Sequence, residues 1–183
     1  MRYLNCLSFF PSAHRKSVIF ATLLISIFFI YSCREPSPGA SSAELGKPAP
    51  NFKLGDSKGR VWNLADLKGN VIFLNFWATW CPPCREEMPS MEALNRSLDS
   101  VPFQMLTILN NDDPAQADTF LRKLNSNLPV LVDADGRTAA AYGITGVPET
   151  FIIDAKGILR KKIIGGHDWN SQPAKDLIKS YLP

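Results

Sequence analysis

The chain has 183 residues, of which 45% are hydrophobic and 20% are charged, and its formal net charge at pH 7 is +3. The first 33 residues hold three of the 20 basic residues and no acidic one, so residues 34–183 carry 17 basic and 17 acidic side chains. The excess positive charge therefore belongs to the N-terminal segment and gives no reason to expect nucleic-acid binding. The remaining length suits one globular domain with a substantial core.

Segment 1–33 has the pattern of a secretory signal sequence, because basic residues precede an uncharged, mainly apolar run over 18–31. This run is shorter than the roughly 20 apolar residues that a membrane-spanning helix needs. Cys33 follows Ile30-Tyr31-Ser32, which resembles a bacterial lipobox. We expect a lipoprotein anchored through Cys33, with an uncleaved membrane anchor as the alternative. Both place the domain outside the cytoplasm.

Residues 34–47 are rich in Pro, Ser, Gly and Ala, and we expect them to form a flexible linker to a domain over 48–183. Hydrophobic periodicity and turn residues predict that this domain is α/β. The predicted strands are, in chain order, 52–54, 61–63, 71–77, 103–109, 130–132, 150–153 and 158–164. The predicted helices are 64–68, 82–100, 114–125, 138–142 and 172–181. The first two strands form a hairpin, the next two a parallel crossover, and the last two an antiparallel hairpin.

Two cysteines, Cys81 and Cys84, stand three residues apart where the strand 71–77 gives way to a helix. Pro82 and Pro83 suit the first turn of that helix. Unpaired N–H groups and the dipole at a helix N-terminus favour a thiolate, so the pKa of Cys81 should be lowered. Cys84 lies further in, where desolvation should keep it a thiol until it resolves a mixed disulfide. The spacing therefore predicts a redox-active dithiol in which Cys81 attacks first.

Two other uses of the cysteine pair are a zinc site and a structural disulfide. Zinc needs more ligands than the domain offers, since Cys6 and Cys33 precede it and His167 is its only histidine. A structural disulfide would close a loop too short to constrain the unfolded chain much. We expect no metal at this site.

Two longer stretches resemble the thioredoxin superfamily, and most closely its extracytoplasmic branch represented by TlpA, ResA and CcmG, also called DsbE. They are Asn-Phe-Trp-Ala-Thr-Trp-Cys-Pro-Pro-Cys-Arg-Glu-Glu-Met-Pro at 75–89 and Gly-Val-Pro-Glu-Thr-Phe-Ile-Ile-Asp at 146–154. The resemblance covers 48–183. It implies a thioredoxin-like fold with an N-terminal β-hairpin extension, an inserted helix near 113–125, and a central mixed sheet flanked by helices.

The resemblance also implies a substrate-binding surface beside the dithiol. In such folds, the loop that matches Val147 and Pro148 carries a cis-proline, and its backbone hydrogen-bonds an extended segment of the substrate. We assign this role to Val147 and Pro148. Trp80 should project near Cys81 as an apolar platform for substrates, whereas Trp77 should lie in the core.

A proton acceptor is needed because Asn75 stands where cytoplasmic thioredoxin typically has a buried aspartate. Glu87 lies three residues after Cys84, on the same face of the predicted helix, and matches a glutamate of the ResA-like pattern. A carboxyl group close to a buried thiol can have a raised pKa and take up the thiol's proton. The alternative for Glu87 is a solvated, ion-paired residue. Glu149 resembles the CcmG pattern and is a second candidate for proton transfer, at the substrate site. The alternative for Glu149 is an exposed loop carboxylate.

The sequence therefore predicts a membrane-tethered, extracytoplasmic thiol:disulfide oxidoreductase that needs no diffusible cofactor. By the resemblance, its substrates are protein disulfides, with apocytochrome c during cytochrome c maturation as a candidate. Its electrons would come from a membrane thiol-reducing donor of the DsbD or CcdA kind, and we expect a monomer.

Two further functions stay open from the sequence alone. One is a thiol-based metal carrier or an apocytochrome-binding module, although copper carriage usually recruits an additional histidine or methionine. The other is a peroxiredoxin-like peroxidase, because residues 46–52 have a similar opening. However, Ala78 stands where that family needs threonine.

Overall fold

The computed structural model of the chain describes residues 43–183. The predicted signal sequence, Cys33 and residues 34–42 of the predicted linker lie outside these residues. The rest of the predicted linker, 43–47, is hydrogen-bonded to the domain. The N–H of Ala43 donates to the carbonyl of Ala141 at 3.0 Å, and that of Gly46 donates to Leu159 at 2.8 Å. The linker prediction is therefore wrong for 43–47, because backbone groups of this stretch find partners in the domain.

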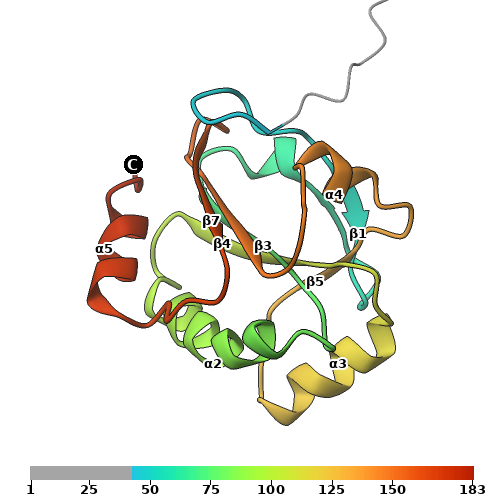
Figure 1. Cartoon of the computed structure of the whole chain (residues 1–183). Coiled ribbons are helices and arrows are strands. Elements are labelled where there is room, and N and C mark those ends of the chain that lie inside the picture. Colours follow the sequence, from blue (N-terminus) through green and yellow to red (C-terminus); the bar gives the residue numbers. More distant parts are fainter. Residues whose placement is uncertain (1–42) are drawn as a thin grey trace, which may run out of the picture. The chain divides into compact units, whose positions relative to one another are not determined.

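A five-stranded mixed sheet forms the centre of the domain, in the order β5-β4-β3-β6-β7 (Figure 1). Its strands are β3 (Val71–Trp77), β4 (Phe103–Leu109), β5 (Val130–Val132), β6 (Glu149–Ile153) and β7 (Leu159–Ile164). The central strand β3 pairs in parallel with β4 and antiparallel with β6. Every residue of β3 is buried, as expected for a β-branched and aromatic run with neighbours on both edges. A separate hairpin of β1 (Lys53–Gly55) and β2 (Val61–Asn63) precedes the sheet.

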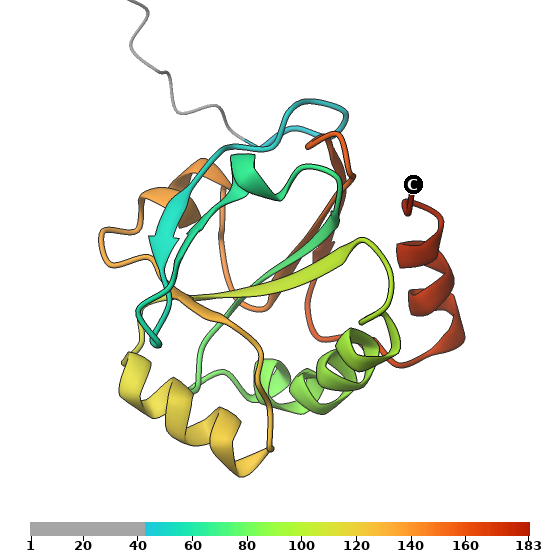
Figure 2. The same ribbon diagram turned by 180° about the vertical axis from the view of Figure 1, so that it is seen from behind.

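Helices cover both faces of the sheet, as the two opposite views show (Figures 1 and 2). The helices α2 (Pro82–Ser97), α3 (Pro114–Lys123) and α5 (Gln172–Lys179) contribute to the core on one face. The 3-10 helix η1 (Leu64–Leu67), the short helix α4 (Arg137–Ala141) and the hairpin lie on the other face. The fold is thioredoxin-like, with the N-terminal hairpin and the inserted helix α3 that the sequence predicted.

The two faces of β3 belong to two different cores because strand side chains alternate. Phe73 and Trp77 pack with α2, whereas Leu74 and Phe76 pack with α4 and the hairpin. Asn75 shares the α2 side, where its side chain meets Glu87 of that helix. This alternation decides which polar residues of the sheet can reach the dithiol.

Most predicted elements are confirmed, and the differences lie at the ends of helices and, by one residue, of the strands β1, β6 and β7. The helix predicted to extend to 100 ends at Ser97, where the N–H of Leu98 turns back to the carbonyl of Asn95 at 3.2 Å. The helix α3 ends two residues before the predicted 125, and Asn125 has a positive φ of 52°, a conformation that a helix cannot continue. None of the helices within 43–183 is long and apolar enough to cross a membrane.

Candidate active site

The dithiol lies at the N-terminus of α2, where Cys81 is the N-cap residue. Cys81 and Cys84 form a disulfide, with their Cα atoms 5.3 Å apart. The backbone N–H of Cys84 donates to the Cys81 sulfur at 3.3 Å, which in the reduced state would stabilise a Cys81 thiolate. Cys84 itself has no exposed surface. Cys81, at the helix start, is 3% exposed, so both cysteines are buried in the disulfide.

The loop that contains Val147 and Pro148 lies beside this dithiol. The Val147–Pro148 peptide bond is cis. The carbonyl oxygen of Val147 is 3.5 Å from the Cys81 sulfur, and the carbonyl of Pro148 accepts a hydrogen bond from the N–H of Gly165 at 2.9 Å. Pro148 is buried and Val147 is half-buried. The loop thus places backbone groups next to the reactive sulfur, where a substrate segment could pair with them.

Trp80 is exposed next to Cys81, with 59% of its surface accessible, whereas Trp77 is fully buried. The loop between β4 and α3 holds this part of the chain. The Trp80 indole N–H donates to the carbonyl of Asn111 at 3.3 Å, and the N–H of Thr79 donates to the Asp112 carboxylate. The Trp80 side chain is therefore exposed to solvent, while hydrogen bonds to Asn111 and Asp112 hold this part of the chain in place.

Glu87 is the buried polar group of the site, with 3% of its surface exposed. Its Oε1 accepts a hydrogen bond from Asn75 Nδ2 at 3.0 Å. Its Oε2 accepts from the Trp169 indole N–H at 3.0 Å and from the backbone N–H of His167 at 3.2 Å. Burial raises the pKa of Glu87 above its ordinary value, and the three donors only partly offset that effect. The solvated, ion-paired alternative for Glu87 is wrong.

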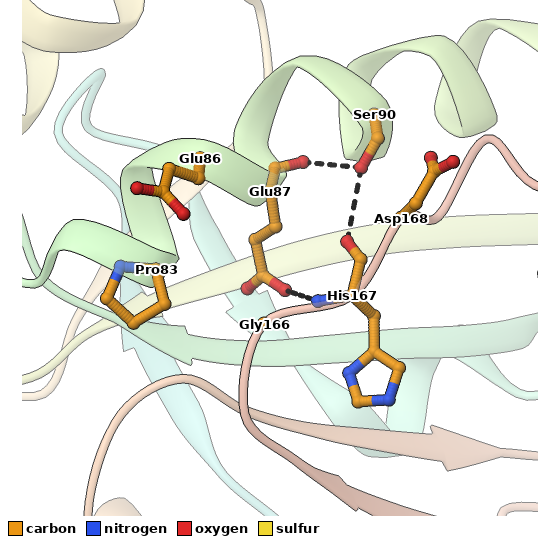
Figure 3. Close-up of a pocket in the computed structure, with 7 residues that line it drawn as sticks. All are labelled: Pro83, Glu86, Glu87, Ser90, Gly166, His167 and Asp168. Atoms are coloured by element: carbon orange, nitrogen blue, oxygen red, sulfur yellow. Dashed lines mark hydrogen bonds between the residues drawn. The ribbon is translucent and has the colours of Figure 1, made fainter.

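A cavity of about 360 Å³ opens beside this carboxylate, between α2 and the loop after β7 (Figure 3). In Figure 3 the carboxylate points toward the backbone of His167, while the His167 ring is turned away from it. A Cβ atom on Gly166 would lie 3.2 Å from the Pro83 backbone, so this loop packs closely on the start of α2. The lining residues are Pro83, Glu86, Glu87, Ser90, Gly166, His167 and Asp168.

Glu149 is buried in the sheet and does not lie in an exposed loop. It is the first residue of β6, is 1% exposed, and pairs with Phe76 on the face of the sheet away from α2. Lys162 Nζ lies 2.8 Å from its Oε2, and Thr145 donates to its Oε1. Although burial opposes ionisation, these partners hold the pKa of Glu149 below its ordinary value. The exposed-loop alternative for Glu149 is wrong, because a cation on the neighbouring strand compensates the buried charge.

Three residues of the site were missed by sequence reasoning: Thr150, His167 and Trp169. Trp169 is 1% exposed and follows Cys84 by 85 positions, so no local spacing connects the two. The one available signal is an indole within the polar stretch 165–172, which is typical of a side chain anchored in a core. Among residues 43–183, no three His, Cys, Asp or Glu side chains gather to hold a metal ion.

Comparison with known proteins gives consistent family assignments. The family model described as AhpC/TSA matches residues 45–162. Thiol-disulfide oxidoreductase ResA of Bacillus subtilis is 35% identical over 127 residues, which cover 69% of this chain and 71% of that protein.

Solved structures agree with these matches. A Chlorobium tepidum protein assigned as the thiol:disulfide interchange protein DsbE superposes with a TM-score of 0.70 and 30% identity, covering 76% of this chain and 99% of its own. The exposed lipoprotein thioredoxin Etrx1 of Streptococcus pneumoniae superposes with a TM-score of 0.60 and 28% identity, covering 72% and 96%. Since the match to the family model over 45–162 includes both cysteines and the loop around Pro148, the similarity extends over the region that would carry the chemistry. The chain therefore belongs to the AhpC/TSA family, and it is a thiol:disulfide oxidoreductase with a thioredoxin-like fold.

Proposed function

We propose that this oxidoreductase reduces protein disulfides outside the cytoplasm while tethered to a membrane. The observation that carries the proposal is the Cys81–Cys84 pair at the start of α2, one helical turn before the buried carboxyl group of Glu87. A dithiol with unequal sulfurs and a nearby proton acceptor has the parts that disulfide exchange requires.

The proposed reaction passes two electrons from the dithiol to the substrate. The Cys81 thiolate attacks one sulfur of a substrate disulfide, forming a mixed disulfide and releasing the other substrate sulfur as a thiolate. The Cys84 thiol then loses its proton and attacks the Cys81 sulfur. This second step forms the Cys81–Cys84 disulfide and releases the second substrate sulfur, so the substrate is reduced and the enzyme is oxidised.

Glu87 is the proposed acceptor of the Cys84 proton. The two residues are one turn apart on α2 and both are buried against the sheet. A raised pKa makes the Glu87 carboxylate a better base than an exposed glutamate, which suits proton transfer near neutral pH. Glu86, the preceding residue, is exposed on the helix and is the natural comparison.

The proposed substrate site combines Trp80 with the backbone at Val147 and Pro148. Trp80 offers an exposed aromatic surface next to Cys81, and among the described residues the N–H of Val147 donates no hydrogen bond. An extended segment of the substrate could use that N–H while its cysteine faces Cys81. Glu149 has no part in this site, because its carboxylate is paired with Lys162 on the other face of the sheet.

The proposed tether rests on the sequence outside the described residues, and the proposed partners rest on the resemblance to the extracytoplasmic branch. The signal sequence over 1–33 and the lipobox-like residues before Cys33 support a lipoprotein anchor, and the similar Streptococcus pneumoniae protein is named an exposed lipoprotein. The domain would then begin near residue 43, face the extracytoplasmic space, and act as a monomer. Candidate partners are apocytochrome c as the substrate and a membrane thiol-reducing donor of the DsbD or CcdA kind.

The direction of electron flow can be tested through the reduction potential. We would equilibrate the full chain, with Cys6 and Cys33 replaced by serine, against defined thiol redox buffers at pH 7. A reductant should have a potential near that of thioredoxin, about −270 mV. A potential near that of DsbA, about −120 mV, would make the protein an oxidant and would overturn the proposed role.

The unequal roles of the sulfurs predict different outcomes for their replacement. In the same background, Cys84→Ala should accumulate a mixed disulfide between Cys81 and a disulfide-containing reporter peptide, because no second sulfur can release it. Cys81→Ala should form no such adduct, since the remaining sulfur is fully buried. Intact-mass spectrometry measures both. An adduct formed equally by the two variants contradicts the assigned roles.

Glu87→Gln should slow turnover, because the amide cannot accept the Cys84 proton. Positioned acids and bases contribute roughly 10²- to 10⁴-fold, so we expect a loss of about tenfold or more in disulfide reduction at pH 7. The dependence of the turnover rate on pH should also lose the change that the titration of Glu87 causes. Glu86→Gln serves as the matched control and should behave like the unchanged protein. Equal rates for the two variants would exclude proton transfer by Glu87.

The raised pKa of Glu87 also predicts a pH dependence of folding stability. In the unfolded chain a glutamate titrates near about 4.3, so above that pH the folded state binds more protons than the unfolded state. The favourable contribution of neutral Glu87 to the free energy of unfolding is complete below the pKa of the unfolded state. This contribution is lost as pH rises through the pKa of the folded state. Oxidised Glu87→Gln should therefore gain stability relative to the unchanged protein by about 1.4 kcal/mol for each pH unit within this window. Denaturant unfolding from pH 4 to 8 measures the difference, and a change of opposite sign would mean that the folded pKa is lowered.

A further inference from the structure

The inner oxygen of Glu87 is held by a polar pair deep in the sheet. Asn75 Nδ2 donates to Glu87 Oε1 at 3.0 Å and to Thr150 Oγ1 at 2.9 Å. Asn75 is fully buried and Thr150 is 1% exposed. No donor within residues 43–183 reaches the Oδ1 atom of Asn75. A buried carbonyl oxygen without a partner costs about 1–3 kcal/mol, so its presence beside a proton acceptor calls for an explanation.

Every polar group that contacts the Glu87 carboxyl group donates a hydrogen bond to it. The backbone N–H of His167 and the indole N–H of Trp169 can only donate. Such a set suits the carboxylate, but a neutral carboxylic acid carries a hydrogen of its own and needs an acceptor. Asn75 is the one neighbour among these three that contacts the carboxyl group through a side chain with both a donor and an acceptor end, since His167 contacts it through its backbone N–H.

The charged side chains near Glu87 are on its outer side. Glu86 from α2 and His167 and Asp168 from the loop after β7 line the cavity next to Oε2. The sheet side, toward Oε1, presents the uncharged groups of Asn75 and Thr150. The hydrogen-bond partner of a proton on Oε1 is therefore set by Asn75.

We propose that Asn75 is a positioning residue whose amide turns over when Glu87 takes up a proton. This inference rests on the proposed function of Glu87 as the proton acceptor. In the ionised state, Nδ2 donates to Glu87 and to Thr150. In the neutral state, the amide rotates by half a turn about its Cβ–Cγ bond, and Oδ1 accepts from the Glu87 O–H and from the Thr150 hydroxyl.

The rotation does not change the number of unpaired groups, because each orientation leaves one end of the Asn75 amide without a partner. Before the rotation that end is Oδ1, and afterwards it is Nδ2, at the same place. The Thr150 hydroxyl can follow either orientation, since it can both accept and donate. Thr150 lies two residues after Pro148, so the proton state of Glu87 is communicated to the strand that carries the substrate loop.

The test uses two replacements that remove the proposed partners one at a time. Asn75→Leu removes both ends of the amide at similar volume, and Thr150→Val removes only the hydroxyl. Thr107→Val is the matched control. Thr107 pairs with Asn75 on the neighbouring strand β4, but its hydroxyl donates to the carbonyl of Pro129 at 2.7 Å. Infrared spectra of the full chain would follow the C=O band of neutral Glu87 as pH is lowered, with Glu87→Gln identifying that band.

We expect Asn75→Leu to shift the band of the neutral acid to higher frequency, because its O–H loses an acceptor, and to slow turnover about tenfold. Thr150→Val should shift the band less, and Thr107→Val should leave it in place. A band that stays unmoved in both Asn75→Leu and Thr150→Val would overturn the inference, because Asn75 would then be a donor to the carboxylate only. If instead Glu87→Gln leaves turnover unchanged, the proposed proton transfer fails, whatever the infrared band does.

Discussion

The burial of one carboxyl group, that of Glu87, organises the reactive end of this protein. A buried charge or acid is tolerated only with hydrogen-bond partners, and here they come from two separate parts of the chain outside α2: β3 and the loop after β7. The hydrogen bonds to the Glu87 carboxyl group therefore hold α2 against the sheet and hold the loop after β7 against α2. The same group that costs stability positions the helix that carries Cys81 and Cys84.

The alternation of side chains along the strands separates two kinds of buried glutamate. Glu87 meets Asn75 on the α2 face, and burial raises its pKa. Glu149 lies on the other face, where Lys162 supplies a compensating charge and the pKa is lowered. The two buried carboxylates therefore differ in chemistry: one is suited to exchange a proton, and the other to remain ionised as a structural ion pair.

Sequence reasoning identified the elements with strong local patterns and missed contacts between distant segments. The strands Val71–Trp77 and Phe103–Leu109 were predicted with their observed bounds, because apolar runs between turn residues are a local signal. The dithiol and its position at a helix start were also local. The contacts of Trp169 with Glu87 and of Lys162 with Glu149 join residues brought together by the sheet and its loops, and neither spacing nor composition could reveal them. For this reason, sequence reasoning could not identify the buried environment of Glu149.

The support of Trp80 by the loop between β4 and α3 connects the inserted helix to the reactive surface. The carbonyl of Asn111 and the carboxylate of Asp112 hold Trp80 and Thr79, while neither contacts a sulfur. The loop before α3 thus holds the exposed indole in its orientation, whereas the two cysteines lie at the start of α2. Under the proposed role of Trp80 in substrate binding, changes at 111–112 would alter which proteins are recognised without altering the cysteines that react.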